Sequence, residues 1–359
     1  MVDSSGSGTS PRKQLLVTAI LGLLFHAFGG FAAGSFYLPM RKVSGWSWEA
    51  GWFVLGLAAW LVTPVVMAAV TTPDLDSVLT ETPGPTLGYS FLFGLLWGIG
   101  GLTFGLSMRY LGISLGMAVA LGFCAAFGTL VPPLYEGTFG ELVATTGGRQ
   151  TLAGVGVCLA GIGLCGYAGI LKEREQDEQT KRAAVAEFDL WRGLGVAVVS
   201  GLLSACFAFA LTAGEPIGAL AEAAGTAPIF RNTAALVIIL LGGLTTNLTY
   251  CLLLFVQRGT NADLTAPEHP NRRNAGWAAL GGVTWYFQFF FYGMGAAYLG
   301  ERFGFASWTL HMAFIILFSN LWGLYLREWK GSSRRVIGWL VAGLLTLVFS
   351  TVMIGLVEG

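Results

Sequence analysis

Apolar residues run in long, nearly unbroken stretches along this chain, and short polar segments separate them. A helix that crosses a bilayer needs about 20 apolar residues, and runs of this length with glycine or proline near their ends are typical of helices. The pattern predicts an all-α membrane protein with ten transmembrane helices, at residues 14–38, 50–72, 86–108, 111–134, 151–171, 191–212, 232–256, 275–298, 304–326 and 335–357.

The composition supports a membrane protein and excludes several classes of function. Of the 359 residues, 54% are hydrophobic and only 11% are charged, whereas soluble domains carry about 25% charged residues. The net charge is zero, which argues against nucleic-acid binding. The sequence has no GxxxxGK[ST] phosphate loop and no HExxH zinc motif. We therefore expect no cofactor, no metal site and no enzymatic activity, and transport that runs on a gradient or downhill.

The basic residues predict which side of the membrane each connector faces. Fifteen of the 20 Lys and Arg residues lie in the first, third, fifth, seventh and ninth connectors, and connectors rich in these residues face the cytoplasm. Both termini are then outside. We expect a disordered tail at 1–13, a first five-helix unit at 14–171, a cytoplasmic connector at 172–190 and a second five-helix unit at 191–357.

An internal repeat relates the two units. Residues 94–118 align with 282–306 at an offset of 188, with eight identities that include a tryptophan and a tyrosine. A weaker sequence similarity relates 30–36 to 201–207 at an offset of 171. A repeat of five spans places the second copy upside down relative to the first, which is the plan of inverted-repeat secondary transporters. Substrate in such proteins binds near the midplane, where the copies meet.

Polar residues inside membrane spans are costly, so each is a candidate for function. His26 lies near the middle of the first span and His311 in the ninth. A neutral histidine can bind a sugar hydroxyl, and its pKa suits proton exchange near neutral pH. The alternative is a structural histidine that bonds across helices. Glu301, at a span end, is a third candidate for carrying a proton.

The eighth span carries the densest set of candidates. Trp285, Gln288, Phe289 and Tyr292 share one helix face, and rings with one amide suit a sugar, because C–H groups stack on rings while the amide binds hydroxyls. Such a stripe also occurs facing lipid. Further sugar-binding candidates share the faces of the histidines or match across the repeat: Trp97, Trp308, Tyr37, and the two histidines themselves.

The two copies of the repeat differ in side-chain size at the positions of the eighth span's candidates. Gly98, Gly100 and Gly101 occupy the positions that correspond to Tyr286, Gln288 and Phe289. We expect the first copy to clear space that the second copy fills. Trp97 and Trp285 occur in both copies and fit symmetric packing equally well. Glu49 begins the second span, where a carboxylate is favourable at a helix N-terminus without any function.

Several segments resemble one transporter family along almost the whole chain. They are FY and P at 36–39, RKV at 41–43, WSWE at 46–49, LLWGIGGLTFGLSMRYLGISLGMAVALG at 95–122, GGR at 147–149, LKERE at 171–175, TWYFQFFFYGMG at 284–295 and SWTLHM at 307–312. The segments are similar to those of the L-rhamnose–proton symporter family, within the drug/metabolite transporter superfamily. The resemblance implies ten helices in two inverted halves, and import of L-rhamnose with protons across the inner membrane of a bacterium.

Two other functions fit part of the pattern. One is export of drugs or metabolites by a member of the same superfamily, and the other is a membrane sugar receptor or enzyme without a transport cycle. The missing catalytic motifs disfavour an enzyme, and the inverted repeat disfavours a static receptor. The expected partners are L-rhamnose or a related deoxy- or pentose sugar, protons and the lipid bilayer. The sequence leaves sodium open as an alternative coupling ion.

Overall fold

The computed structural model describes residues 11–111, 113–175, 189–327 and 329–355. Residues 1–10 of the expected tail and 176–188 of the expected connector lie outside these ranges. The side chains of 301–305, which include that of Glu301, are also outside the described part. Within the described ranges, every regular element is a helix.

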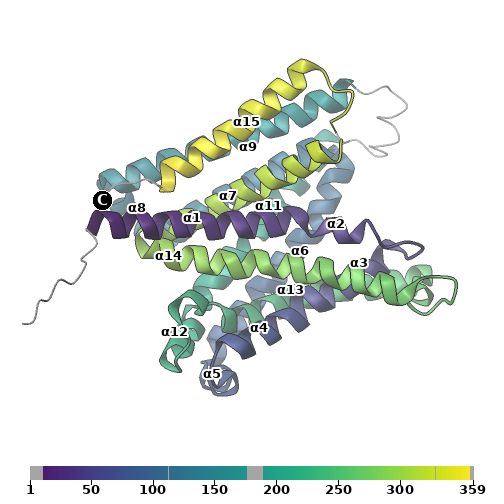
Figure 1. The fold of residues 1–359 in the computed structure, drawn as a ribbon, viewed down its shortest axis with the longest axis horizontal. Helices are drawn as coiled ribbons and strands as arrows, with labels where there is room; N and C mark the ends of the chain where they lie inside the picture. The colour runs from purple at the N-terminus through teal and green to yellow at the C-terminus, as the bar shows by residue number, and fades with distance from the viewer. Residues whose placement is uncertain (1–10, 112, 176–188, 328, 356–359) are drawn as a thin grey trace, which may run out of the picture.

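The elements follow one another along the chain (Figure 1). They are α1 Pro11–Ser35, α2 Tyr37–Met40, α3 Trp48–Leu57, the π-helix η1 Ala58–Val62, α4 Thr63–Thr71, α5 Leu75–Glu81, α6 Gly84–Leu111, α7 Ile113–Tyr135, α8 Phe139–Ala144, α9 Thr146–Glu175, α11 Leu190–Ala213, α12 Glu215–Ala223, the 3-10 helix η2 Pro228–Phe230, α13 Thr233–Arg258, the 3-10 helix η3 Thr260–Leu264, α14 Asn271–Tyr325 and α15 Arg334–Gly355.

Eight helical segments in the described part are long and apolar enough to cross a membrane. Two expected spans, 111–134 and 275–298, are not among those eight, although both are helical, in α7 and in the first part of α14. The helix α14 is divided at Gly300, whose φ of 67° lies in the left-handed region that glycine adopts readily. The prediction of an all-helical membrane protein is confirmed.

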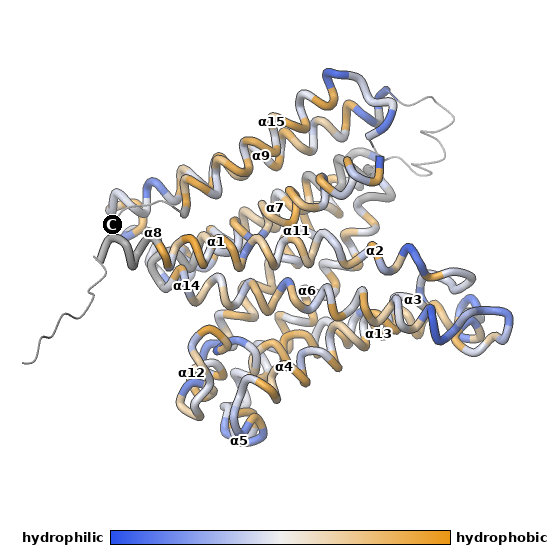
Figure 2. The backbone as a smooth tube through the Cα atoms, in the orientation of Figure 1, coloured by the Kyte–Doolittle hydropathy of each residue, from blue (hydrophilic) through white to orange (hydrophobic). Residues whose placement is uncertain are grey.

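The chain returns repeatedly to the same two ends of the molecule. In Figure 1, the start of α1 and the end of α15 lie beside α8, at the same end of the molecule as α5 and α12, whereas the connector between α2 and α3 lies at the opposite end with the connector between α13 and α14. Figure 2 shows hydrophilic segments at these ends and hydrophobic residues along the helices between them. This distribution fits a bilayer that covers the middle of the molecule.

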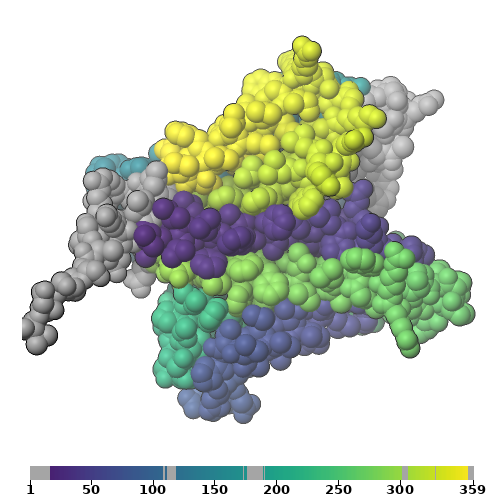
Figure 3. Space-filling model, in the orientation of Figure 1, coloured from purple at the N-terminus to yellow at the C-terminus, as the bar shows by residue number. Residues whose placement is uncertain are grey.

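The helix α1 lies between the two parts of α14, as the space-filling view also shows (Figure 3). Small residues permit this close approach. A Cβ added to Gly29 would lie 2.9 Å from the Gln288 carbonyl oxygen and 3.1 Å from the His311 ring, and one added to Gly22 would lie 2.8 Å from Leu299. Glycine therefore brings α1 against both parts of α14 at once.

The helix α11 lies in a similar way against α6 and α7. The Ser200 hydroxyl donates to the Gly100 carbonyl of α6 at 3.0 Å. A Cβ added to Gly201 would lie 2.7 Å from the Ala120 carbonyl oxygen of α7, and it would also press on the Phe123 side chain. A third close pair joins α9 to α15.

The glycines of α6 do not clear a pocket opposite the eighth span, so that expectation was wrong. Gly98 packs against Thr246 of α13, and Gly100 packs against Ser204 of α11. Gly101 is exposed and has no atom within 4 Å of an added Cβ. The sequence signal was real, but close helix packing is its physical cause.

Candidate functional site

Two histidines from opposite ends of the sequence meet where α1 packs against α14. His26 is fully buried and His311 is 1% exposed, with ring centroids 6.2 Å apart. The Tyr292 ring touches both, at 5.4 Å from His26 and 5.2 Å from His311. Trp308 lies 5.8 Å from Tyr292. These four residues are called the histidine cluster below.

The histidines have unused hydrogen-bonding capacity. Within the described part of the chain, neither ring nitrogen of His26 or of His311 has a hydrogen-bond partner. A buried polar group left unpaired costs about 1–3 kcal/mol, so packing alone does not favour these two side chains. Trp308 differs, because its indole N–H donates to the Cys124 carbonyl at 3.0 Å. The cluster therefore combines one fixed ring with nitrogens that are able to bind a hydroxyl or a proton.

Glycines give the two imidazoles their positions. A Cβ added to Gly295 would lie 2.9 Å from both Cδ2 and Nε2 of His26, and one added to Gly29 would lie 3.1 Å from the His311 ring. Any larger residue at either position must displace a histidine ring or a helix. The local sequence thus allows the imidazoles to sit directly between two closely packed helices.

A row of rings continues from the histidine cluster toward the other half of the chain. Trp308 stacks on Phe207 at 5.9 Å, and Phe207 stacks on Phe289 at 4.5 Å. Trp97 touches both Phe207 and Phe289, at 5.2 and 5.5 Å. Three of the predicted site residues, Trp97, Phe289 and Trp308, are therefore joined through Phe207, which was not among the residues predicted for the site.

Trp285 belongs to a second group, called the tryptophan cluster. Its ring lies 4.0 Å from Phe36, 5.5 Å from Trp52 and 5.7 Å from Trp60. The Trp52 indole donates to Asn247 at 3.2 Å, whereas the indole nitrogens of Trp60 and Trp285 have no partner in the described residues. Trp60 also lies 6.2 Å from Trp97, and this contact connects the two clusters.

Sequence reasoning missed Trp52 and Trp60. Trp60 is 2% exposed and sits in the π-helix η1, and short π segments are frequent at functional sites. The Thr63 hydroxyl donates to the Ala58 carbonyl at 2.7 Å across this segment. The available signal was the spacing of the tryptophans: Trp52 lies four residues after Trp48 and eight before Trp60, which places each pair on neighbouring parts of the helix surface.

The remaining predicted residues are placed less centrally. Gln288 is buried, 7% exposed, and its backbone carbonyl faces Gly29 of α1. Tyr37 is 48% exposed, and its ring contacts Phe36 rather than either histidine. The structure therefore does not bring Tyr37 to the histidine cluster. The side chain of Glu301 lies outside the described residues.

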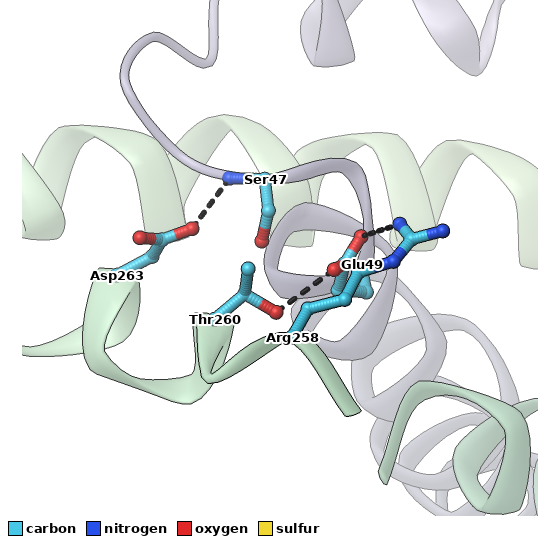
Figure 4. Close-up of polar contacts among 5 residues, drawn as sticks. All are labelled: Ser47, Glu49, Arg258, Thr260 and Asp263. Atoms are coloured by element: carbon cyan, nitrogen blue, oxygen red, sulfur yellow. Dashed lines mark hydrogen bonds and ion pairs between the residues drawn. The ribbon is translucent and has the colours of Figure 1, made fainter. Parts of the chain in front are cut away.

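Polar contacts tie the connector before α3 to the connector after α13 (Figure 4). The Glu49 carboxylate, 2% exposed, accepts a hydrogen bond from Thr260 at 2.8 Å and lies 3.5 Å from the Arg258 guanidinium. The Ser47 backbone N–H donates to Asp263 at 2.7 Å. This backbone bond lowers the pKa of the Asp263 carboxyl below its usual value.

The same two connectors are joined at further points. The Ser44 N–H donates to the Asn274 amide oxygen at 3.2 Å, and that amide donates back to the Ser44 carbonyl at 2.8 Å. The Trp46 indole donates to Asn271 at 2.8 Å. We call this set of contacts between 44–49 and 258–274 the connector clasp. Sequence analysis had assigned Glu49 only a favourable place at a helix end.

The described part of the chain contains no metal site and no disulfide bond. No three His, Cys, Asp or Glu residues come together there as metal ligands would. The five cysteines are buried and free.

Comparisons with known proteins find the same family over nearly the whole chain. The family described as L-rhamnose-proton symport protein (RhaT) matches residues 16–358. Similar proteins named L-rhamnose-proton symporter occur in Cronobacter sakazakii, 39% identical over 339 residues, and in Mannheimia succiniciproducens and Yersinia pestis, each 38% identical over 340 residues. Each alignment covers 94% of this chain and 97% of the relative.

Proposed function

The chain belongs to the L-rhamnose–proton symporter family, and from this premise we propose how it moves its sugar. It is a transporter and not an enzyme, a multi-pass protein of the bacterial inner membrane that imports L-rhamnose together with protons. Transport of this kind needs no cofactor. The observation that carries the mechanism is the pair of buried imidazoles whose four ring nitrogens have no partner among the described residues.

We infer ten spans in two inverted five-helix units, 14–171 and 191–357. Helical α7 and the first part of α14, added to the eight apolar segments, supply the ten. The packing also supports the repeat. Gly94 lies against Ile239 of α13, and its counterpart Gly282 lies against Leu55 of α3. Likewise α1 packs on both parts of α14, while α11 packs on their counterparts α6 and α7.

The orientation follows from charge. We propose that the first, third, fifth, seventh and ninth connectors face the cytoplasm and that both termini are outside, because 15 of the 20 Lys and Arg residues lie in these five connectors. The connector clasp then closes the cytoplasmic end. The halves move relative to one another in alternating access, so the clasp must open before sugar leaves.

We assign the coupling proton to His26 and His311, which face each other across α1 and α14. Glu301 is kept as an alternative carrier. The sugar site extends from the histidine cluster along Phe289 and Trp97 to Trp285, with Gln288 beside it. C–H faces of the sugar stack on these rings, and the unpartnered imidazole nitrogens bind its hydroxyls. Tyr37, exposed beside Phe36, is expected at most on the path by which sugar leaves.

Counterflow tests this function directly. Purified protein is placed in liposomes loaded with unlabelled L-rhamnose, and uptake of radiolabelled L-rhamnose is followed. We expect transient accumulation that unlabelled L-rhamnose outside abolishes. Absence of exchange at every gradient tested contradicts the transporter function. Parallel assays with other deoxyhexoses and with pentoses define the sugar, and sodium-free buffer separates proton from sodium coupling.

A further inference from the structure

The segment α3–η1–α4 packs against α13, and different side chains hold the two together at each end of the pair. At one end the Thr71 and Thr72 hydroxyls contact the Thr233 hydroxyl at 2.8 and 3.4 Å. At the other end the buried Glu49 carboxylate is held by Thr260 and Arg258. Hydroxyls keep their protonation state at all physiological pH values, whereas a carboxylate can gain a proton. The two closures therefore differ in chemistry.

Charge strengthens the Glu49 closure. Hydrogen bonds to an ionised carboxylate are roughly twice as strong as neutral ones, and Glu49 is shielded from water while its partner Arg258 is 59% exposed. Protonation of Glu49 removes the ion pair and leaves a neutral acid in a buried place. Arg258 can then turn to solvent, because its guanidinium is already largely exposed.

The connector clasp spans the two halves of the chain. Glu49 and Ser47 come from the first half, and Arg258, Thr260 and Asp263 come from the second (Figure 4). We propose that Glu49 is a proton-responsive positioning residue for transport: its carboxylate form holds the cytoplasmic end closed, and its protonation releases α3 from α13. This inference rests on the proposed function for its direction, because the orientation makes this end cytoplasmic.

Other ionisable groups lie around Glu49. Cys251 of α13 interacts with its charge, Arg258 ends α13, and Asp263 and His269 belong to the connector that follows and interact with each other. Asp263 binds the Ser47 backbone and not Glu49. The pH response of the clasp therefore has to be separated from that of Asp263 and His269 by substitution.

Cys251 is a built-in reporter of opening. It is 1% exposed and lines a narrow cleft between α3–η1 and α13 together with Trp52, Trp60 and Asn247, behind the clasp. Opening the clasp exposes its thiol to the aqueous side. The four other cysteines are also buried and serve as internal controls for general loosening of the fold.

The experiment uses the full chain in lipid nanodiscs, a membrane-impermeant maleimide and mass spectrometry that resolves each cysteine. We expect Glu49→Gln to speed labelling of Cys251 roughly tenfold at neutral pH, equivalent to about 1.4 kcal/mol, with the other cysteines unchanged. Thiols react more slowly as the pH falls, so wild-type labelling is divided by that of Glu49→Gln at each pH. This ratio should rise toward one as the pH is lowered.

Matched variants make the result decisive. Asp263→Asn, on the same connector, should keep the rising ratio, and Arg258→Gln should speed labelling of Cys251 at neutral pH. A ratio that does not change with pH, or slow labelling of Cys251 in both Glu49→Gln and Arg258→Gln, overturns the proposal. If Glu49→Gln fails to fold, Thr260→Val gives the same comparison with the charge retained. The assay needs no sugar, so failed counterflow with a rising ratio contradicts the proposed function alone.

Discussion

In the region around His26 and in the region around Ala197 one helix packs closely against others, but the first region holds polar side chains and the second holds mainly apolar ones. At the first, α1 meets α14, and at the second, α11 meets α6 and α7. Applying the repeat offsets of 171 and 188 to the histidine cluster gives its counterparts in the second region: Ala197, Phe104, Ala120 and Phe123. Ala120 and Ala197 are buried together there with Phe104 beside them.

The apolar region shows what this packing needs. Ala197 and Ala120 are 0% and 1% exposed, and neither side chain carries a polar atom to satisfy. At the positions that the repeat offsets pair with Ala197 and Phe123, four histidine ring nitrogens have no hydrogen-bond partner among the described residues. Because the positions that correspond to the histidine cluster are packed with apolar side chains, the imidazoles are better explained by transport than by stability.

The largest expected effect is a loss of proton uptake when the histidine region is altered, with no such loss when the apolar region is altered. His26→Gln and His311→Gln should each lower L-rhamnose-driven proton uptake by at least about 100-fold, since an amide does not take up a proton near neutral pH. Exchange of sugar needs no net proton movement and should persist, because the glutamine amide can still bind the sugar hydroxyl. A pH dye in liposomes measures the first and counterflow the second.

The control is Phe104→Leu in the apolar region, which should leave coupling unchanged. Normal proton uptake in both histidine variants transfers the role to Glu301 and removes the functional contrast between the regions.

The second-largest expected effect is a loss of sugar affinity when residues of the proposed sugar site are truncated. Gln288→Ala leaves a buried sugar hydroxyl without its partner, which costs about 1–3 kcal/mol, so L-rhamnose binding should weaken about 10- to 100-fold. Trp285→Ala should lose a comparable amount through stacking. Calorimetry on purified variants measures both. Gly105→Ala, on the exposed face of α6, is the control. Wild-type affinity in Gln288→Ala would place the sugar elsewhere.

A smaller effect is expected where the apolar region has a hydrogen bond of its own. Ser200 donates to Gly100 within a fully buried contact, so Ser200→Ala should lower the stability by about 1 kcal/mol and leave coupling intact. Thermal unfolding in detergent gives the first quantity and the pH dye the second. Loss of coupling with unchanged stability would show that this region also takes part in transport.

The smallest effect concerns pH at the connector clasp. The bond from Ser47 lowers the pKa of Asp263, so the stabilisation is present above the ordinary carboxyl pKa and is lost as the pH falls through the lowered value. Asp263→Asn should therefore melt slightly below wild type at neutral pH, with the gap closing in acid. A gap that widens in acid contradicts this assignment. Glu268→Gln, on the same connector, is the charge-matched control.

The helices could be predicted from the sequence, but which helices pack against one another could not. Long apolar stretches specified helices because a membrane leaves few other structures available, and His26 and His311 stood out as buried polar residues. Their meeting depends on how α1 enters between the parts of α14, which no local pattern encodes. The clasp joins residues about 210 positions apart in sequence, and α5, α8 and α12 are too short for a periodic signal.

The central claim is that an asymmetric histidine site couples sugar to protons inside a repeated fold. The most direct test adds L-rhamnose to liposomes that contain only this protein, with no imposed gradient, and records the external pH. We predict alkalinisation that depends on L-rhamnose and disappears in the His26→Gln, His311→Gln double variant. Sugar entry without any pH change in the wild type, or the same alkalinisation in the double variant, would contradict the account.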